Sequence, residues 1–304
     1  MDFQDRINRL RKISDRFQLS EDFPLLKGFR LSPADKAAVE TSTAYFLYES
    51  LRNSNPAFAD VLDGQFFERN AKDLLALPNV TPNGLVLPKE PNFLSYNILH
   101  KTISRIFQSW QIDSWVKSIH VPINVRLVSG NIKSSVQERP RATTKVHSDI
   151  WAAEPANCLM IFFAVFGDYA RTGIEFFEPK KFPKELMRPL DDFRQGQVLM
   201  NDAVKYDVSY PVGTVLLSDP FLLHRTMAKD GGPRLSLDFR VILNERVASD
   251  VYTDSPRLSN YVSPSNWCEY GTRRALTSHD ALDFIPGPDK VSNSNAARFQ
   301  TVDI

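Results

Sequence analysis

Apolar residues recur at helical spacing over roughly the first 120 residues of the 304-residue chain and at strand spacing after them. A first amphipathic helix is predicted by apolar positions three or four residues apart, at Phe3, Ile7, Leu10, Ile13 and Phe17. A second helix should begin at Ser32-Pro33-Ala34-Asp35, because a serine cap precedes proline and an acidic residue there. A third apolar stripe predicts a long helix near residues 92–118.

From Val121 onward, short apolar runs are separated by turn signals, which predicts antiparallel strands. The turns are expected at Gly130-Asn131, Gly167-Asp168, Pro211 and Asp230-Gly231. Many short antiparallel strands favour an α+β protein with a double-stranded β-helix core, the jelly-roll or cupin-like architecture, and helices packed on one sheet. We expect a mainly helical part over residues 1–119 and the jelly-roll core over 120–245. Residues 246–304 should form an extension, either a surface segment or a lid, within one integrated domain.

The predicted strand after residue 233 has two chemically different faces. Because side chains alternate along a strand, its apolar residues share one face: Leu235, Leu237, Phe239, Val241 and Leu243. The other face carries Arg234, Ser236, Asp238 and Arg240. The apolar face should be packed on the helices, and the polar face either meets solvent or lines a polar cavity.

His147-Ser148-Asp149 provides the candidate chemistry. The histidine and the aspartate are two positions apart, so both side chains would project from one face of a strand, and residues 143–146 read as a short β-branched strand before them. His224 follows an apolar run predicted to be a buried strand. Taken alone it would be an ordinary core histidine. With His147 and Asp149 it completes a set of two imidazoles and one carboxylate that binds iron(II) and leaves three positions open.

Asp230-Gly231-Gly232-Pro233 is a strong turn signal, which predicts that His224 and Arg234 lie on adjacent strands of one hairpin. Ser236 would then share a face with Arg234. A guanidinium and a hydroxyl beside a metal ligand suit the distal carboxylate of a dicarboxylate.

This pattern of His-x-Asp, a distant His and an Arg-x-Ser about ten residues later resembles the iron(II)- and 2-oxoglutarate-dependent dioxygenases over roughly residues 120–245. The segments around Glu154-Pro155 and Gly173-Ile174-Glu175 look like those of bacterial members acting in specialised metabolism or sugar modification. The resemblance implies that His147, Asp149 and His224 bind iron, and that Arg234 and Ser236 bind 2-oxoglutarate. It also implies oxidation of an unactivated C–H bond by O₂ with release of succinate and CO₂, ascorbate being a supporting reductant.

Three further residues are candidates for the site. Arg240 shares a face with Arg234 and is the alternative anchor for the cosubstrate. Arg126 and Trp151 are candidate substrate contacts, because binding pockets combine apolar walls with a few polar groups. The resemblance also implies hydroxylation or a related oxidation rather than halogenation, since halogenating relatives lack a carboxylate where this chain has Asp149.

The remaining histidines and the cysteines are expected to have no role in the chemistry. We expect His100 to lie within the long helix and His120 at its end, solvated or capping, and His279 not to be a ligand. Cys158 and Cys268 should be buried thiols in a reducing compartment.

The formal net charge of +1 indicates a small-molecule substrate rather than a nucleic acid, and leaves a homo-oligomer open. No apolar run suits a signal peptide or a membrane span, so a cytoplasmic enzyme is expected. Two other classes stay open: a cupin-type metalloenzyme that does not use 2-oxoglutarate, and a non-catalytic jelly-roll binding protein.

Overall fold

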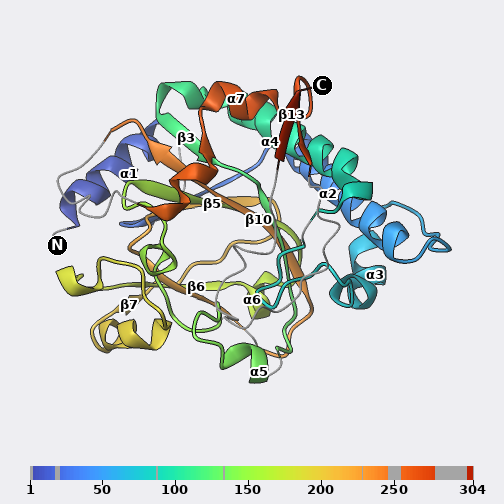
Figure 1. Cartoon of the computed structure of the whole chain (residues 1–304). Helices are drawn as coiled ribbons and strands as arrows, with labels where there is room; N and C mark the ends of the chain where they lie inside the picture. Colours follow the sequence, from blue (N-terminus) through green and yellow to red (C-terminus); the bar gives the residue numbers. More distant parts are fainter. Residues whose placement is uncertain are drawn as a thin grey trace.

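The fold is known from a computed structural model, which describes residues 3–17, 21–86, 88–132, 134–227, 229–245, 255–277 and 300–303. Helices α2 and α4 lie on one side of the central strands β5 and β10, and β6 and β7 lie on the other (Figure 1). The α-helices are α1 (Gln4–Phe17), α2 (Pro33–Ser54), α3 (Phe66–Leu75), α4 (Phe93–Ser109), α5 (Ser134–Gln137), α6 (Tyr169–Thr172) and α7 (Pro264–Glu269).

Two of the three helix predictions are confirmed: α1 contains the first apolar stripe from Ile7 to Phe17, with Phe3 just before it, and α2 begins after Ser32. The third is too long. Helix α4 ends at Ser109, because Gln111 adopts a left-handed conformation with φ of 52° and a short 3-10 turn follows. The last residues of the predicted helix, 116–118, instead begin strand β3 (Val116–His120).

Ser32→Ala should lower the free energy of unfolding by about 0.5–2 kcal/mol, the usual contribution of an N-cap. The Ser32 hydroxyl accepts a hydrogen bond from the Asp35 amide at 3.1 Å, which satisfies one of the free N–H groups at the start of α2. Urea unfolding measures the change. Ser32→Gly is the control and should cost only a few tenths of a kcal/mol; an equal loss in both variants would contradict a capping role.

Two antiparallel sheets form the core. The large sheet has the order β1 (Glu21–Phe23), β2 (Leu26–Arg30), β8 (Thr214–Ser218), β5 (Cys158–Gly167), β10 (Arg234–Leu243), β3 and β11 (Tyr261–Val262), and β4 (Asn124–Val128) also pairs with β10. The small sheet has the order β7 (Val204–Lys205), β6 (Ile174–Glu178) and β9 (Leu223–Thr226). Strands β12 (Arg274–Thr277) and β13 (Gln300–Asp303) pair separately. The predicted α+β jelly-roll class is confirmed.

Strand β10 has the two faces that its alternation predicts. Its apolar residues belong to the core cluster shared with α4 and α7, where the Phe239 ring lies 5.2 Å from Phe107 and 5.6 Å from Trp267. Its polar face is buried as well, and Arg234, Asp238 and Arg240 line a cavity rather than meeting bulk solvent. Helices therefore cover the outside of the large sheet, and the polar groups point between the sheets.

The predicted hairpin between His224 and Arg234 is wrong. Strand β9 pairs with β6 in the small sheet, whereas β10 pairs with β5, β4 and β3 in the large sheet. The turn at residues 230–233 therefore carries the chain from one sheet to the other. The apolar face of β10 explains this, because it can be buried only in the sheet that the helices cover.

The large sheet also recruits strands from both ends of the chain. Strands β1 and β2 come from the part expected to be mainly helical, and β11 comes from the C-terminal extension. The division at residues 119 and 245, and the role of the extension as a lid, stay predictions. In the part of the chain that the structure describes, no helix has both the length and the apolar character needed to cross a membrane.

Candidate active site

A cavity of about 740 Å³ lies between the two sheets, and both sheets contribute to its wall. The large sheet provides Arg126 on β4 and Arg234, Asp238 and Arg240 on β10, while the small sheet provides His224 on β9. His147 and Asp149 join them from the segment before β5. The structure thus brings all three predicted metal ligands and both candidate arginines to one cavity.

His147 and His224 face each other across a short backbone bridge. The amide of each donates to the carbonyl of the other, at 2.9 and 2.8 Å, and the ring centroids are 4.3 Å apart. The strand predicted over residues 143–146 is wrong, because these residues form a turn and only His147 pairs with a neighbouring strand. Asp149 begins a 3-10 helix, Asp149–Ala152, instead of continuing a strand.

Both imidazoles are neutral and present an unprotonated nitrogen. The Nδ1 atom of His147 lies 2.8 Å from the Lys145 carbonyl, and that of His224 lies 3.1 Å from the Leu222 carbonyl. A carbonyl oxygen only accepts, so Nδ1 carries the hydrogen and Nε2 keeps its lone pair. Burial lowers the pKa of both side chains and so disfavours their charged forms. A neutral imidazole fixed through its other nitrogen is a suitable metal ligand.

The carboxylate of Asp149 has one satisfied and one free oxygen. Its Oδ1 accepts a hydrogen bond from Arg240 Nη2 at 3.0 Å, whereas Oδ2 is buried without a hydrogen-bond partner in the described part of the chain. Burial raises the pKa of Asp149, but the electrostatic effects of Arg240 and His224 and the hydrogen bond from Arg240 together outweigh burial, so the pKa lies below its usual value. Asp149 is therefore an ionised, buried carboxylate with an unused acceptor.

These donors fit a divalent metal in their chemistry: two neutral imidazole nitrogens and a carboxylate oxygen without a protein partner. Among the residues that the structure describes, however, no three His, Cys, Asp or Glu side chains are arranged around a common point that would hold a metal ion. Arg240 engages the Asp149 carboxylate instead.

Arg234 is a wholly buried guanidinium without a carboxylate partner among the described residues. Its Nε donates to the Thr172 carbonyl and its Nη1 to the Ser236 hydroxyl at 2.7 Å, while Nη2 has no hydrogen-bond partner among the residues that the structure describes. The guanidinium carbon lies 5.5 Å from the centre of the Phe162 ring and 5.7 Å from that of Tyr169. A buried positive charge with a free donor in a cavity wall is suited to bind an anion.

Arg240, the rival of Arg234, is already bound to carboxylates. It donates to Asp238 at 2.7 Å and to Asp149, and its Nε lies 3.9 Å from Glu154. An arginine that already has three acidic neighbours gains less electrostatic stabilisation from a further anion than an arginine without acidic neighbours gains from its first. The contacts therefore favour Arg234 as the anion-binding residue and give Arg240 the role of positioning Asp149.

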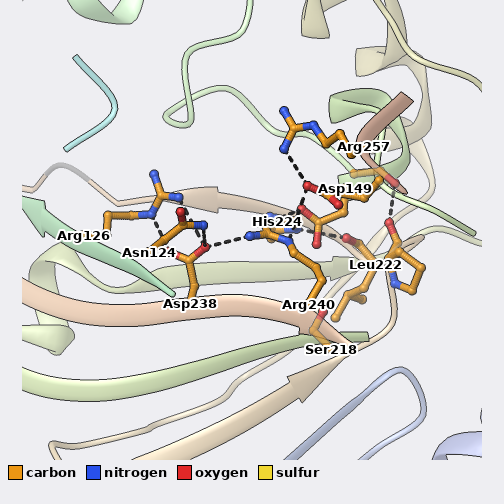
Figure 2. A network of polar contacts seen from close by, with 12 residues as sticks. Asn124, Arg126, Asp149, Ser218, Leu222, His224, Asp238, Arg240 and Arg257 are labelled. Atoms are coloured by element: carbon orange, nitrogen blue, oxygen red, sulfur yellow. Dashed lines mark hydrogen bonds and ion pairs between the residues drawn. The ribbon is translucent and has the colours of Figure 1, made fainter. Parts of the chain in front are cut away.

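Arg240 belongs to a larger buried network, in which Asn124, Arg126 and Arg240 converge on Asp238 (Figure 2). Burial opposes ionisation of Asp238, but the charges of Arg126 and Arg240 keep its pKa below the usual value. At the other end, Glu154 accepts from Arg257 at 2.6 Å and from Tyr261 at 2.8 Å. The alternation along β10 places Asp238 in the cavity, whereas no local pattern points to Arg257.

The two predicted substrate contacts have different positions. Arg126 lies in the cavity wall, with its Nε donating to Asp238 at 2.8 Å. Trp151 is wholly buried outside the cavity lining, and its indole donates to the Leu186 carbonyl at 2.9 Å. A Cβ added to Gly196 would lie 2.1 Å from the Trp151 ring, which shows how closely that ring is packed. The structure gives Trp151 a core position.

His100 and His120 are not solvated or capping as predicted. His100 is fully buried in α4, where its Nε2 lies 3.1 Å from the Trp267 carbonyl, and burial lowers its pKa to about 4. His120 belongs to β3 and lines the cavity. His279 lies outside the described residues. Both cysteines are free thiols; Cys158 is buried, and Cys268 is only half-buried.

No protein-family model and no curated protein matches this sequence. Among solved structures, the chain is similar to SnoK, a non-heme alpha-ketoglutarate-dependent carbocyclase from nogalamycin biosynthesis, with 10% identity, a TM-score of 0.41, and coverage of 84% of this chain and 92% of that one. AviO1 from Streptomyces viridochromogenes Tue57 gives 11% identity, a TM-score of 0.43, and coverage of 82% and 99%. An N-substituted L-amino acid dioxygenase from Burkholderia ambifaria AMMD, in complex with alpha-ketoglutarate, gives 9% identity, a TM-score of 0.39, and coverage of 78% and 87%. At these identities the likeness concerns the fold and says nothing of substrate or activity.

Proposed function

We propose that this protein is an iron(II)- and 2-oxoglutarate-dependent oxygenase that hydroxylates, or otherwise oxidises, an unactivated C–H bond of a small molecule. The observation that carries the proposal is Arg234, a buried guanidinium with an unpartnered Nη2 in the same cavity as two neutral histidines and an ionised aspartate. In a cupin-type enzyme without 2-oxoglutarate, or in a binding protein, this buried charge would have no cosubstrate to bind and would need an anionic ligand of another kind.

The roles follow from the free atoms of each side chain. The Nε2 atoms of His147 and His224 and the Oδ2 atom of Asp149 would hold iron(II), and Arg234 with Ser236 would hold the distal carboxylate of 2-oxoglutarate. Iron, when bound, supplies activation of dioxygen coupled to conversion of 2-oxoglutarate to succinate and CO₂. The protein orients both molecules in the cavity.

Anaerobic titration with iron(II) and then 2-oxoglutarate tests the assignment. Bidentate binding of the keto acid to iron should give a weak visible charge-transfer band, which neither alternative class produces. With oxygen and ascorbate, the loaded protein should release succinate slowly alone and faster with its substrate. No succinate above a no-enzyme control, from protein shown by elemental analysis to contain iron, would favour the alternatives.

Arg234→Ala should weaken 2-oxoglutarate binding by about 1.5–3 kcal/mol, the range of a charge-assisted hydrogen bond, and leave iron affinity nearly unchanged. Titration of the iron-loaded protein with 2-oxoglutarate measures the loss. Arg225→Ala is the matched control, because Arg225 is a half-exposed arginine of β9 outside the cavity lining. If Arg240→Ala weakened 2-oxoglutarate binding more than Arg234→Ala, the anchor would be Arg240.

A further inference from the structure

The charged residues of the cavity wall do not balance one another. Its guanidinium groups are Arg126, Arg141, Arg234, Arg240 and Arg257, and its carboxylates are Asp149, Glu154 and Asp238. Arg126 and Arg240 pair with Asp238, Arg240 also with Asp149, and Arg257 with Glu154. Two arginines, Arg234 and Arg141, are therefore left without a buried carboxylate among the described residues.

Arg141 is fixed in place with its terminal nitrogens available. Its Nε donates to the Leu190 carbonyl at 2.8 Å, which orients the guanidinium. Its only acidic neighbour among the described residues is Asp191, whose carboxylate is 3.7 Å from Nη2 and 99% exposed, so water screens the pair. Burial lowers the pKa of Arg141, and the nearby positive charge of Arg257 lowers it further. An incoming anion would relieve both effects.

The position of Arg141 places it beside the proposed reaction centre. The neighbouring Pro140 carbonyl accepts from the Phe193 amide at 3.0 Å, and the Phe193 ring stacks on His147 with centroids 4.6 Å apart. The backbone that carries Arg141 is thus tied to the aromatic ring that covers a candidate ligand. A molecule held by Arg141 would lie along the same wall as His147.

We propose that Arg141 binds an anionic group of the substrate, so that the substrate class is a small organic anion carrying a carboxylate or a phosphate. This inference rests on the proposed function, in which the other unpaired arginine, Arg234, is occupied by 2-oxoglutarate. A planar guanidinium with two free nitrogens can form two parallel hydrogen bonds to either anion. The cavity volume of about 740 Å³ is in the range of sites that hold small-molecule ligands.

The test uses inorganic phosphate and propionate as probes, titrated calorimetrically into the full-length protein at saturating 2-oxoglutarate. At least one probe should bind, and Arg141→Gln should weaken it about tenfold or more, with 2-oxoglutarate affinity unchanged. The probe that binds more tightly identifies the anion as phosphate or carboxylate. Arg188→Gln is the matched control, because Arg188 is an exposed arginine outside the cavity lining that also donates to a backbone carbonyl.

Asp191→Asn provides a second variant that cannot disturb the core, because Asp191 is almost fully exposed. It removes the only acidic neighbour of Arg141 in the described part of the chain and should strengthen probe binding about twofold. Failure of both probes to bind, or equal binding by the wild type and Arg141→Gln, would overturn the proposal. Failure of 2-oxoglutarate itself to bind would be a different result, which would contradict the proposed function rather than the role of Arg141.

Discussion

Replacing His224 with alanine should abolish iron(II) binding and leave the metal-free protein folded. The substitution removes one of two neutral imidazoles whose Nε2 is unprotonated, and a site of two remaining donors loses most of its affinity. Elemental analysis after anaerobic gel filtration should show about one iron per chain in the wild type and almost none in the variant. His147→Ala and Asp149→Ala should behave alike, because each supplies one of the three donor groups.

His120→Asn is the control for this experiment. His120 lines the same cavity and is equally buried, but it is not among the proposed donors. Its variant should keep the iron content of the wild type, and circular dichroism should show that all variants retain their secondary structure. Stoichiometric, tight iron binding by His224→Ala would remove His224 from the site.

Features encoded by neighbouring residues could be predicted from the sequence. The alternation of apolar and polar residues along β10 predicted which side chains lie on each face, since this alternation depends only on the extended backbone. The serine cap of α2 is likewise a local signal. The packing of α4 against Phe239 followed from matching two apolar stripes.

Pairing between distant strands could not be predicted in the same way. The turn at residues 230–233 looks the same whether its flanking strands pair with each other or join different sheets, so the hairpin of His224 and Arg234 was a reasonable but wrong prediction. Residues 143–146 have strand propensity, yet no neighbour offers them a continuous row of hydrogen bonds. Tertiary pairing overrides propensity in both cases.

The residues of the candidate site divide in the same way, into those that local sequence predicts and those that depend on contacts between distant segments. The resemblance named His147, Asp149, His224 and Arg234, and the fold brings them to one cavity. The partners that set their charges could not be found from spacing, because they arrive from separate strands and from the segment after residue 254. Arg257 and its bond to Glu154 depend on a contact between residues 103 positions apart.

Arg240→Met should lower the free energy of unfolding by about 3–5 kcal/mol at neutral pH, the usual cost of removing one partner from a buried ion pair. Methionine fills similar space. Among the described residues, it leaves neither oxygen of Asp149 with a partner and leaves Arg126 as the only guanidinium partner of Asp238. Urea unfolding of the metal-free protein measures the loss. Arg225→Met is the control and should cost at most about 1 kcal/mol, because Arg225 is 43% exposed and Glu175 keeps its lysine partners.

The effect of Arg240→Met should also shrink as the pH falls. The pKa of Asp238 in the folded protein is below its ordinary value, so its stabilising contribution is present above the unfolded pKa of about 3.9 and is lost as the pH falls below it. Without Arg240 the pKa of Asp238 should rise toward its ordinary value, and the variant should lose less stability on acidification than the wild type. Urea unfolding at a series of pH values between about 6 and 3 would show the two curves converging. A difference that stayed constant or grew with acidification would mean that Arg240 stabilises the fold by packing rather than by charge.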